Sequence, residues 1–292
     1  MARCLVTGHK GYIGSSVYEQ LKNMGHEVMG IDLKEGKDIL RELKPDSDGK
    51  FHPHWAAFRP EYIFHLAAMP RVSYSVEHPV EVIENNLLSS LYILEFARAV
   101  GAQRVIYSSS SAVVGDGNGP ENPYGASKLM PESLCSVWSK LYGLDTVCLR
   151  YFNVYSPDQK ADGPYATAVA NWMHFIRTGE EPFITGDGEQ RRDMAHKEDI
   201  VAANIFCMES AENFNGAWFD VGTSDNISLN EMKILVHECF PDIKFKYVGS
   251  RAGEVMCTKA DISPLLDLGW TPKHQIKKGI LECFSLLKKE LS

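Results

Sequence analysis

The chain has 292 residues, of which 44% are hydrophobic and 23% are charged, so it is long enough to bury a substantial core in about two domains. Its 30 Lys and Arg against 38 Asp and Glu give a net charge of −8, which argues against a dedicated nucleic-acid-binding protein but not against a local pocket for a phosphorylated small molecule. The amino terminus lacks a signal-peptide pattern and no apolar run is long enough to span a membrane, so we expect a cytoplasmic protein without a membrane partner.

Short apolar runs alternate with longer helical patterns through the first two-thirds of the chain. Five runs are typical of strands buried on both faces of a parallel sheet, namely residues 4–7, 28–31, 62–66, 104–107 and 146–149. Three segments have helical patterns, namely 12–24, 80–100 and 125–142. In the second of these, the 3–4 spacing of Leu87, Leu88, Leu91, Leu94 and Ala97 marks one apolar face. The alternation predicts an α/β fold with a Rossmann-type doubly wound parallel sheet.

The character of the chain changes after about residue 157, where Gly and Pro become frequent. We expect a first, dinucleotide-binding type of domain over 1–157 and a smaller, interleaved α/β lobe over 158–292. The run 217–221 is predicted to be a strand that returns to the first domain, and 262–291 to be helical with breaks at Pro and Gly.

A glycine triplet follows the first predicted strand and opens the first predicted helix. Glycine at positions 8, 11 and 14 permits a tight turn, close approach of the backbone to a pyrophosphate, and close packing of the helix on the sheet. The amino terminus of the helix then offers free N–H groups to the anion. Asp32 ends the second predicted strand, where a carboxylate accepts hydrogen bonds from a ribose and repels a 2′-phosphate. These features favour NAD over NADP.

A tyrosine and a lysine lie four residues apart on the third predicted helix. Tyr124 and Lys128 therefore share one helix face, where the ammonium of Lys128 is expected to lower the pKa of Tyr124 and make it a general base. A serine run, 108–111, ends the fourth predicted strand, and strand ends are where ligands bind in such sheets. Its hydroxyl groups equally suit capping of the following turn.

The cysteines and histidines give no sign of a metal site. The seven cysteines are scattered without a CxxC pair, which is typical of free thiols in a reducing compartment. His52 and His54 have no Cys or carboxylate cluster beside them, so we expect a surface loop there and no metal.

With these motifs the chain resembles the extended short-chain dehydrogenase/reductases, specifically their NAD-dependent epimerase/dehydratase group, over nearly its whole length. Further blocks carry the resemblance: Asp38-Ile39, His65-Leu-Ala-Ala68, the run 150–157 (RYFNVYSP), the run 186–193 (GDGEQRRD) and Arg251-Ala-Gly-Glu254. The resemblance implies NAD as a retained cofactor, bound by Gly8, Gly11, Tyr12, Ile13, Gly14, Asp32, Asp38, Ile39, Leu66, Ala67, Ala68, Asn86, Tyr124, Lys128 and Tyr151.

The same resemblance implies a nucleotide-sugar substrate and assigns roles to particular residues. Ser110, Tyr124 and Lys128 match the family's catalytic residues. The substrate is expected to contact Ser110, Tyr124, Asn153, Arg192 and Arg251. The two arginines suit a nucleotide diphosphate because guanidinium groups bind phosphate oxygens bidentately.

The residues beside the catalytic serine select among the family's reactions. Dehydratases resemble Thr-Asp-Glu and sugar-acid decarboxylases Thr-Ser-Glu at the positions where this chain has Ser110-Ser111-Ala112. Alanine cannot transfer protons, so dehydration and this type of decarboxylation are disfavoured. The Ser-Ser-Ser-Ala pattern resembles that of 4-epimerases of UDP-glucose and of UDP-N-acetylhexosamines, which implies a reaction through a 4-keto intermediate. A 4-keto reductase, a 5-epimerase and a non-catalytic NAD-binding sensor are the alternatives.

Several departures from the family pattern concern the sugar more than the chemistry. Val114 replaces the usual Tyr, Ser156 the usual Gly and Glu254 the usual Asp. The segments after Asp32 and between Ser110 and Tyr124 are short, and Thr258 lies near a position where a large Tyr excludes N-acetyl sugars. The predicted helices 80–100 and 125–142 resemble those that pair in the family's homodimers.

Overall fold

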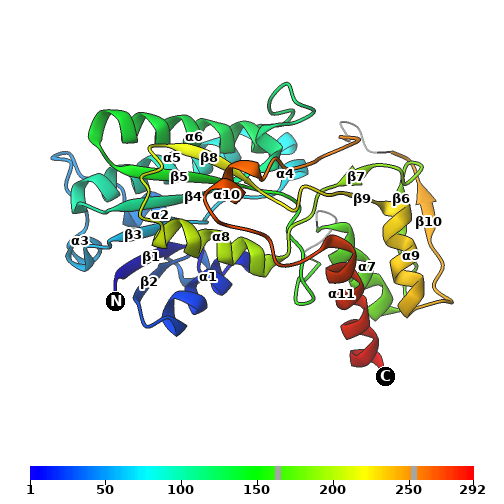
Figure 1. The fold of residues 1–292 in the computed structure, drawn as a ribbon. Coiled ribbons are helices and arrows are strands. Elements are labelled where there is room, and N and C mark those ends of the chain that lie inside the picture. The colour runs from blue at the N-terminus through cyan, green and yellow to red at the C-terminus, as the bar shows by residue number, and fades with distance from the viewer. Residues whose placement is uncertain (162–165, 251–254) are drawn as a thin grey trace. The chain divides into compact units, whose positions relative to one another are not determined.

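The computed structural model describes residues 1–161, 166–250 and 255–292, which form ten strands and eleven α-helices (Figure 1). The strands are β1 (Arg3–Thr7), β2 (Glu27–Ile31), β3 (Tyr62–His65), β4 (Arg104–Ser110), β5 (Asp145–Tyr151), β6 (Phe183–Thr185), β7 (Arg191–Arg192), β8 (Ala217–Val221), β9 (Ile227–Ser228) and β10 (Lys246–Val248). The helices are α1 (Tyr12–Asn23), α2 (Ile39–Glu42), α3 (Pro53–Phe58), α4 (Val72–Glu77), α5 (Pro79–Val100), α6 (Pro123–Tyr142), α7 (Ala168–Thr178), α8 (Lys197–Glu209), α9 (Leu229–Cys239), α10 (Ser263–Asp267) and α11 (Ile276–Leu291).

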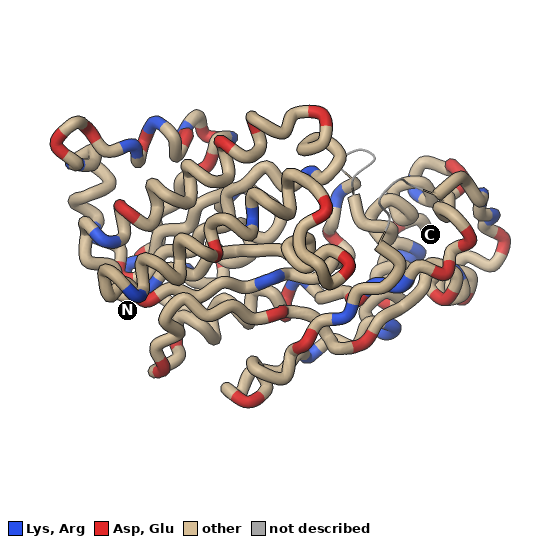
Figure 2. The backbone as a smooth tube through the Cα atoms, turned by 90° about the horizontal axis from the view of Figure 1, so that it is seen from above, with Lys and Arg blue, Asp and Glu red and all other residues tan. Residues whose placement is uncertain are grey.

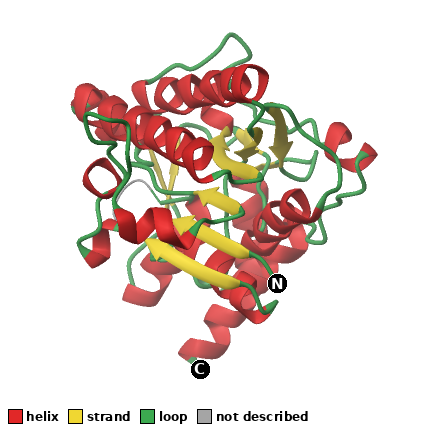
Figure 3. Cartoon of the chain, turned by 90° about the vertical axis from the view of Figure 1, so that its left-hand side faces the viewer, coloured by secondary structure: helices red, strands yellow, loops and turns green. Residues whose placement is uncertain are grey.

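The central sheet confirms the predicted α/β class. Six strands lie in the order β2-β1-β3-β4-β5-β8, and the pairs β1–β2, β1–β3 and β3–β4 are parallel. The chain moves from β1 outward to β2 and then returns to the other side of β1 with β3. Helices α5 and α6 cover one face of the sheet, and α1 and α8 cover the other (Figures 1 and 3). The carboxyl ends of β1 and β3 flank the point where the strand order reverses, which is where such sheets bind ligands.

The residues fall into two compact units. The first unit comprises 1–114, 120–150 and 201–219, and the second comprises 115–119, 151–200 and 220–292. Each has its own core: Leu5, Ile63, Phe96 and Val105 are buried in the first, and Trp172, Met173, Ile184, Val236 and Phe284 in the second. Lys and Arg residues are interspersed with Asp and Glu along the described backbone (Figure 2). None of the helices in the described part of the chain is long and apolar enough to cross a membrane.

The predicted apolar face of α5 is only partly buried. Leu94 and Ala97 are buried, but Leu87, Leu88 and Leu91 are only half-buried. The fully buried positions of this helix include several small polar residues, namely Asn86, Ser89 and Ser90. They lie where the helix packs closely against its neighbours, and hydrogen bonds satisfy their polar groups.

Candidate active site

The glycine turn after β1 has the shape that a dinucleotide phosphate needs. Gly8 adopts φ = 71° and donates its N–H to the carbonyl of Ile31 at 2.8 Å. A Cβ atom at Gly14 would lie 2.1 Å from the carbonyl oxygen of Gly8, so only glycine permits this packing. Gly11 precedes α1 without a side-chain cap, which leaves the first N–H groups of the helix open toward the turn. The turn therefore fits a pyrophosphate bound at a helix amino terminus.

Asp32 and Asp38, in the segment after β2, both accept hydrogen bonds from backbone N–H groups. Asp32 is 8% exposed, and its carboxylate accepts the N–H groups of Lys10 at 2.9 Å and Lys34 at 2.8 Å. Asp38 caps α2 by accepting the N–H of Leu40 at 2.9 Å. Asp32 thus ties the glycine turn to the end of β2, and its contact with a ribose stays a prediction.

A buried relay of hydrogen bonds joins the carboxyl ends of β1 and β3 to α5. The Thr7 hydroxyl accepts the N–H of Ala67 at 3.0 Å and lies 2.8 Å from Nδ1 of His65. Nε2 of His65 lies 3.0 Å from the Ser90 hydroxyl, which donates to the carbonyl of Asn86 at 2.7 Å. Burial lowers the pKa of His65 to about 3, so the ring is neutral, with Thr7 donating to Nδ1 and Nε2–H donating to Ser90.

The other predicted cofactor residues at this edge of the sheet lie in the same unit. Tyr12, Ile13, Leu66, Ala67 and Ala68 are half-buried. Asn86 is buried, and its amide oxygen accepts the N–H of Met69 at 2.7 Å while its amide nitrogen donates to the Ser127 hydroxyl at 2.9 Å. Asn86 therefore joins α5 to α6 and to the segment after β3.

The predicted catalytic residues Ser110, Tyr124 and Lys128 come together in the first unit, on β4 and α6. A hydrogen bond from Ser110 acts to lower the pKa of Tyr124, while burial raises it more strongly. The prediction that Lys128 lowers the pKa of Tyr124 is therefore wrong for this arrangement, in which the pKa is raised. The ammonium of Lys128 instead donates to the carbonyl of Ser108 at 2.9 Å, and burial lowers its pKa to about 7.

Close packing brings α6 to the end of β4. A Cβ atom at Gly125 would lie 2.4 Å from the carbonyl oxygen of Ala112, so glycine beside Tyr124 lets the helix approach this closely. The N–H of Tyr124 donates to the Ser75 hydroxyl of α4 at 3.0 Å. Ser110 also caps the turn after β4, since its hydroxyl accepts the N–H of Ala112 at 3.2 Å. Sequence reasoning missed Ser75, because nothing in its neighbourhood marks it as a partner of α6.

The predicted nucleotide-sugar residues lie in the second unit. Asn153 has φ = 27° and donates from its amide nitrogen to the carbonyl of Asp193 at 2.7 Å. Arg192 precedes Asp193 and donates to the carbonyl of Arg191 at 3.0 Å. Asp193 is buried, and it accepts backbone N–H groups at Thr223, Ser224 and Ala260. Tyr151, at the end of β5, is buried in this unit. Arg251 lies outside the described residues.

A group of possible metal ligands occurs elsewhere in the second unit. His196, Glu198 and His274 have ligand atoms within 4.8 Å of one another. The two imidazole rings are stacked, with centroids 4.0 Å apart and planes at 27°. A nitrogen lone pair lies in the plane of its ring, so stacked rings point poorly at a shared ion. We therefore assign no metal to this group.

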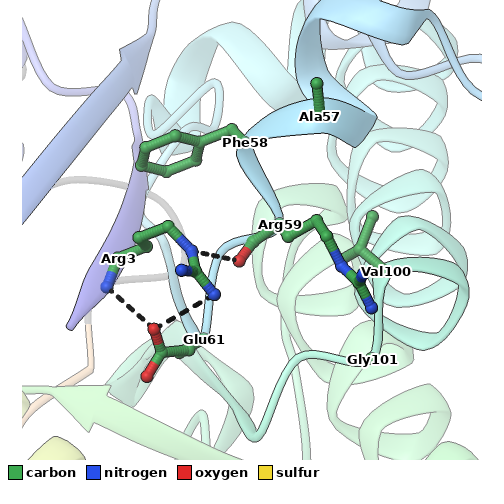
Figure 4. A pocket seen from close by; sticks show the side chains of 7 residues that line it. All are labelled: Arg3, Ala57, Phe58, Arg59, Glu61, Val100 and Gly101. Atoms are coloured by element: carbon green, nitrogen blue, oxygen red, sulfur yellow. Dashed lines mark hydrogen bonds and ion pairs between the residues drawn. The ribbon is translucent and has the colours of Figure 1, made fainter.

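A pocket of about 350 Å³ lies at the amino ends of β1 and β3, opposite the glycine turn (Figure 4). It is lined by Arg3, Ala57, Phe58, Arg59, Glu61, Val100 and Gly101. The guanidinium of Arg3 donates to the carbonyl of Arg59 at 2.9 Å and pairs with Glu61 at 3.3 Å. Because ligands of open α/β sheets bind at the carboxyl ends of the strands, this pocket is separate from the candidate active site.

Comparison with known proteins agrees with this geometry. A curated putative UDP-glucose 4-epimerase from Methanocaldococcus jannaschii is 31% identical, with 97% of this chain and 98% of the relative covered. A UDP-N-acetyl-alpha-D-glucosaminuronate decarboxylase from Bacillus cytotoxicus is 33% identical, with 81% of this chain and 79% of the relative covered. The crystal structure of a UDP-glucose 4-epimerase from Thermotoga maritima with UDP-glucose superposes with a TM-score of 0.88 at 30% identity, covering 99% of this chain and all of the other.

A family model supplies the last piece of evidence. Residues 4–222 match the model of the NAD dependent epimerase/dehydratase family, so the match includes the glycine turn, the Ser110–Tyr124–Lys128 group and the two blocks that contain Asn153 and Arg192. With three-quarters of its residues in the match and relatives aligned over almost its full length, the chain belongs to the NAD dependent epimerase/dehydratase family and is an NAD-dependent enzyme.

Proposed function

We propose that this protein is a nucleotide-sugar 4-epimerase that uses NAD as a retained cofactor and inverts C4 of UDP-glucose and UDP-galactose, or of their N-acetyl analogues. The observation that carries the proposal is the arrangement at the carboxyl end of β4. Ser110 and Tyr124 share a hydrogen bond, Lys128 lies one turn along α6, and the residue two positions after Ser110 is Ala112. This arrangement supports redox chemistry at one hydroxyl without a further acid or base beside the serine.

The reaction follows from the positions of these side chains. Tyr124 takes the proton from the sugar 4-hydroxyl, and Ser110 hydrogen-bonds the same oxygen. Bound NAD would supply the hydride acceptor at C4 and return the hydride to the other face of the 4-keto sugar. Burial disfavours the Tyr124 phenolate, and the hydrogen bond from Ser110 offsets part of this cost.

The cofactor is assigned to the first unit. We propose that the glycine turn and the open amino terminus of α1 hold the pyrophosphate, with Asp32 at the adenosine ribose and Lys128 at the nicotinamide ribose. The close packing of Gly14 on the carbonyl of Gly8, with no side chain between them, supports this assignment. The full proposed set is Gly8, Gly11, Tyr12, Ile13, Gly14, Asp32, Asp38, Ile39, Leu66, Ala67, Ala68, Asn86, Tyr124, Lys128 and Tyr151.

The nucleotide diphosphate is assigned to the second unit, within the proposed lobe 158–292 and the adjoining block 150–157. We propose that Asn153, Arg192 and Arg251 bind it. Support comes from Asn153 and Arg192, which both anchor at the segment around the buried Asp193. Guanidinium groups there match a diphosphate in both charge and geometry.

A homodimer in the cytoplasm is part of the proposal. α5 and α6 pack against each other and carry apolar side chains that remain uncovered, including Val80, Met130, Val137, Leu141 and Tyr142. Half-buried Leu87, Leu88 and Leu91 add to this surface, which supports pairing with the same helices of a second copy. Sedimentation should give twice the monomer mass at micromolar concentration, and a monomer there contradicts the dimer.

Incubation with a panel of UDP-, GDP- and dTDP-sugars tests the catalytic proposal, with the anomeric proton followed by NMR. A UDP-hexose should be converted to its C4 epimer without net production of NADH. A 4-keto or reduced product that requires exchange of NAD(H) with solution would favour a reductase, and inversion at C5 would favour a 5-epimerase. A chain that binds NAD yet converts no sugar would instead be a sensor.

A further inference from the structure

A buried carboxylate lies one helical turn beyond Lys128. Glu132 is 5% exposed, and its two oxygens accept hydrogen bonds from Nε of Arg150 at 2.9 Å and from the terminal nitrogen of Arg150 at 2.7 Å. The hydroxyl of Ser109 donates to the same carboxylate at 2.5 Å. The three side chains come from α6, β5 and β4, so one carboxylate connects the catalytic helix to two adjacent strands.

The arginine of this cluster is itself held in place. The guanidinium carbon of Arg150 lies 3.6 Å from the ring centroid of Trp218 on β8, within the range of a cation–π contact. Its side chain is only 11% exposed. A bidentate pair with little access to water has a fixed geometry, and loss of either partner leaves an unpaired buried charge. Glu132 is therefore fixed relative to β4 and β5.

The cluster touches the catalytic residues on two sides. Ser109 precedes Ser110 on β4, and Lys128 lies at i−4 from Glu132 on the same face of α6. The charge of Glu132 raises the pKa of Lys128 against the lowering caused by burial. The other titratable groups that face Lys128 are His65 of β3, which is neutral, Tyr107 of β4, whose ring centroid lies 5.1 Å from the ammonium, and Tyr124.

We propose that Glu132, clamped by Arg150 and Ser109, is a positioning residue of the active site: it sets α6 against β4 and presents a buried negative charge to the Lys128 ammonium. The inference rests on the proposed function for the roles of Lys128 and Tyr124. Glu132 contacts neither substrate nor cofactor, and it acts through Lys128 and through the neighbour of Ser110.

A second buried pair in the same unit provides a matched control. Arg104 and Asp145 begin β4 and β5, and they pair at 2.5 Å, at the ends of these strands far from Ser110. Both members are as buried as Glu132 and Arg150. Neutralising Asp145 leaves a buried arginine unpaired just as neutralising Glu132 does, but without a catalytic side chain nearby.

The experiment compares Glu132→Gln, Glu132→Asp and Asp145→Asn in the full-length chain, using calorimetric titration with NAD as a function of pH. In E132Q the pH above which NAD affinity declines should fall by about one unit, because the cationic form of Lys128 loses its buried counter-charge. E132D keeps the charge and should keep the wild-type pH dependence. D145N should melt at a lower temperature yet bind NAD with the wild-type pH dependence.

Turnover provides the second measurement. E132Q should lose roughly 10- to 100-fold in kcat through misplaced catalytic groups, and both limbs of its pH profile should move to lower pH. Ser109→Ala removes one hydrogen bond to the carboxylate but leaves the ion pair of Glu132 with Arg150 intact, so we expect this variant to fold. Its kcat should be several-fold lower than that of the wild type. Wild-type kcat in S109A, or an E132Q variant that only melts earlier, would overturn the inference.

The proposed function and the positioning role of Glu132 can be disproved separately. If the wild-type chain converts no sugar, the proposed function fails, while the pH dependence of NAD binding still reports on Glu132. If the chain is an epimerase and E132Q binds NAD like the wild type at every pH, the positioning role fails and the proposed function stands.

Discussion

The two ends of strands β4 and β5 are each held by a buried arginine–carboxylate pair, but the surroundings of the two pairs differ. At the amino ends, Arg104 donates to backbone carbonyls in the last turn of α8 and just after it, and Asp145 accepts two backbone N–H groups from the segment that follows. At the carboxyl ends, Glu132 bonds to side chains, namely those of Arg150 and Ser109. One pair is satisfied by main chain and the other by side chains.

This difference implies different roles for the two pairs, one in the stability of the fold and the other in the geometry of the active site. Backbone partners fix where a segment of chain runs, so the amino-end pair ties the segment after α8 to the sheet. Side-chain partners fix where individual functional groups lie, so the carboxyl-end pair sets the positions of residues beside Ser110 and Lys128. We therefore expect changes at the amino ends to lower stability and changes at the carboxyl ends to lower binding or turnover.

The largest expected effect is at the carboxyl end of β4. Tyr124→Phe removes the proposed base and should lower kcat by about 10²- to 10⁴-fold. Its thermal stability should not fall, because the phenol ring stays and a buried hydroxyl is lost. The matched control is Tyr62→Phe at the amino end of β3, where the lost hydroxyl bonds only to Gln103 at 3.0 Å. Y62F should turn over like the wild type, and similar rates in both variants would remove Tyr124 from the reaction.

The amino-end pair gives the next largest effect. Asp145→Asn leaves the Arg104 guanidinium buried without its carboxylate, which should cost about 3–5 kcal/mol in the free energy of unfolding. Urea unfolding measures this loss, and kcat at 25 °C should equal that of the wild type. A variant with intact stability but reduced kcat would reverse the assignment of the two ends.

Two glycines, one at each edge of the sheet, test the same difference between the carboxyl ends and the amino ends of the strands. Gly14→Ala places a Cβ atom against the carbonyl of Gly8 in the phosphate turn, and the displacement should weaken NAD binding by about 1–3 kcal/mol. Gly101 ends α5 near the amino end of β4 with φ = 73° and open space around it. Gly101→Ala should cost about 1 kcal/mol of stability through its backbone conformation and leave NAD affinity unchanged, as calorimetry and urea unfolding would measure.

Much of the fold and of the site follows from local patterns in the sequence. The strands Cys4–Thr7 and Arg104–Tyr107 were predictable because parallel strands are continuously apolar, and β4 extends to Ser110 only because neighbouring elements bury its serines. Packing likewise explains why the apolar face of α5 is only partly buried: small polar residues occupy the closest contacts of this helix, and Leu87 and Leu91 are left half-buried. Periodicity identifies an apolar face but does not tell which neighbour covers it.

The chemistry of the site was predictable as far as it depends on residue type and spacing. Tyr124 and Lys128 share a helix face for geometric reasons that hold in any helix. The direction of the Tyr124 pKa was not predictable, because it depends on how deeply the fold buries the phenol. Glu132 was missed for a similar reason: it lies on α6 and its partner Arg150 lies on β5, and only the packing of the helix on the sheet brings the two together.

The effect that is smallest near neutral pH, and grows only as acid is added, tests the neutral histidine at the carboxyl end of β3. Burial lowers the pKa of His65 to about 3, whereas an unfolded histidine titrates near 6.5, so below that pH the unfolded state binds more protons. The free energy of unfolding should therefore fall by about 1.4 kcal/mol per pH unit from this group as the pH drops from 6.5 toward 3, and the contribution is fully present above pH 6.5.

A histidine at the opposite edge provides the control for this slope. His65→Gln keeps groups that can bond to Thr7 and Ser90 but cannot take up a proton, so its stability should decline less steeply with acid than that of the wild type. His26 is half-buried near the start of β1, where its Nδ1 accepts the N–H of Ala2 at 3.1 Å, and His26→Gln is the matched control variant. Urea unfolding at pH 7.5, 6.5, 5.5 and 4.5 compares the three. Parallel curves for H65Q and the wild type would contradict the prediction. They would show that protonation of His65 does not set the pH dependence of the free energy of unfolding.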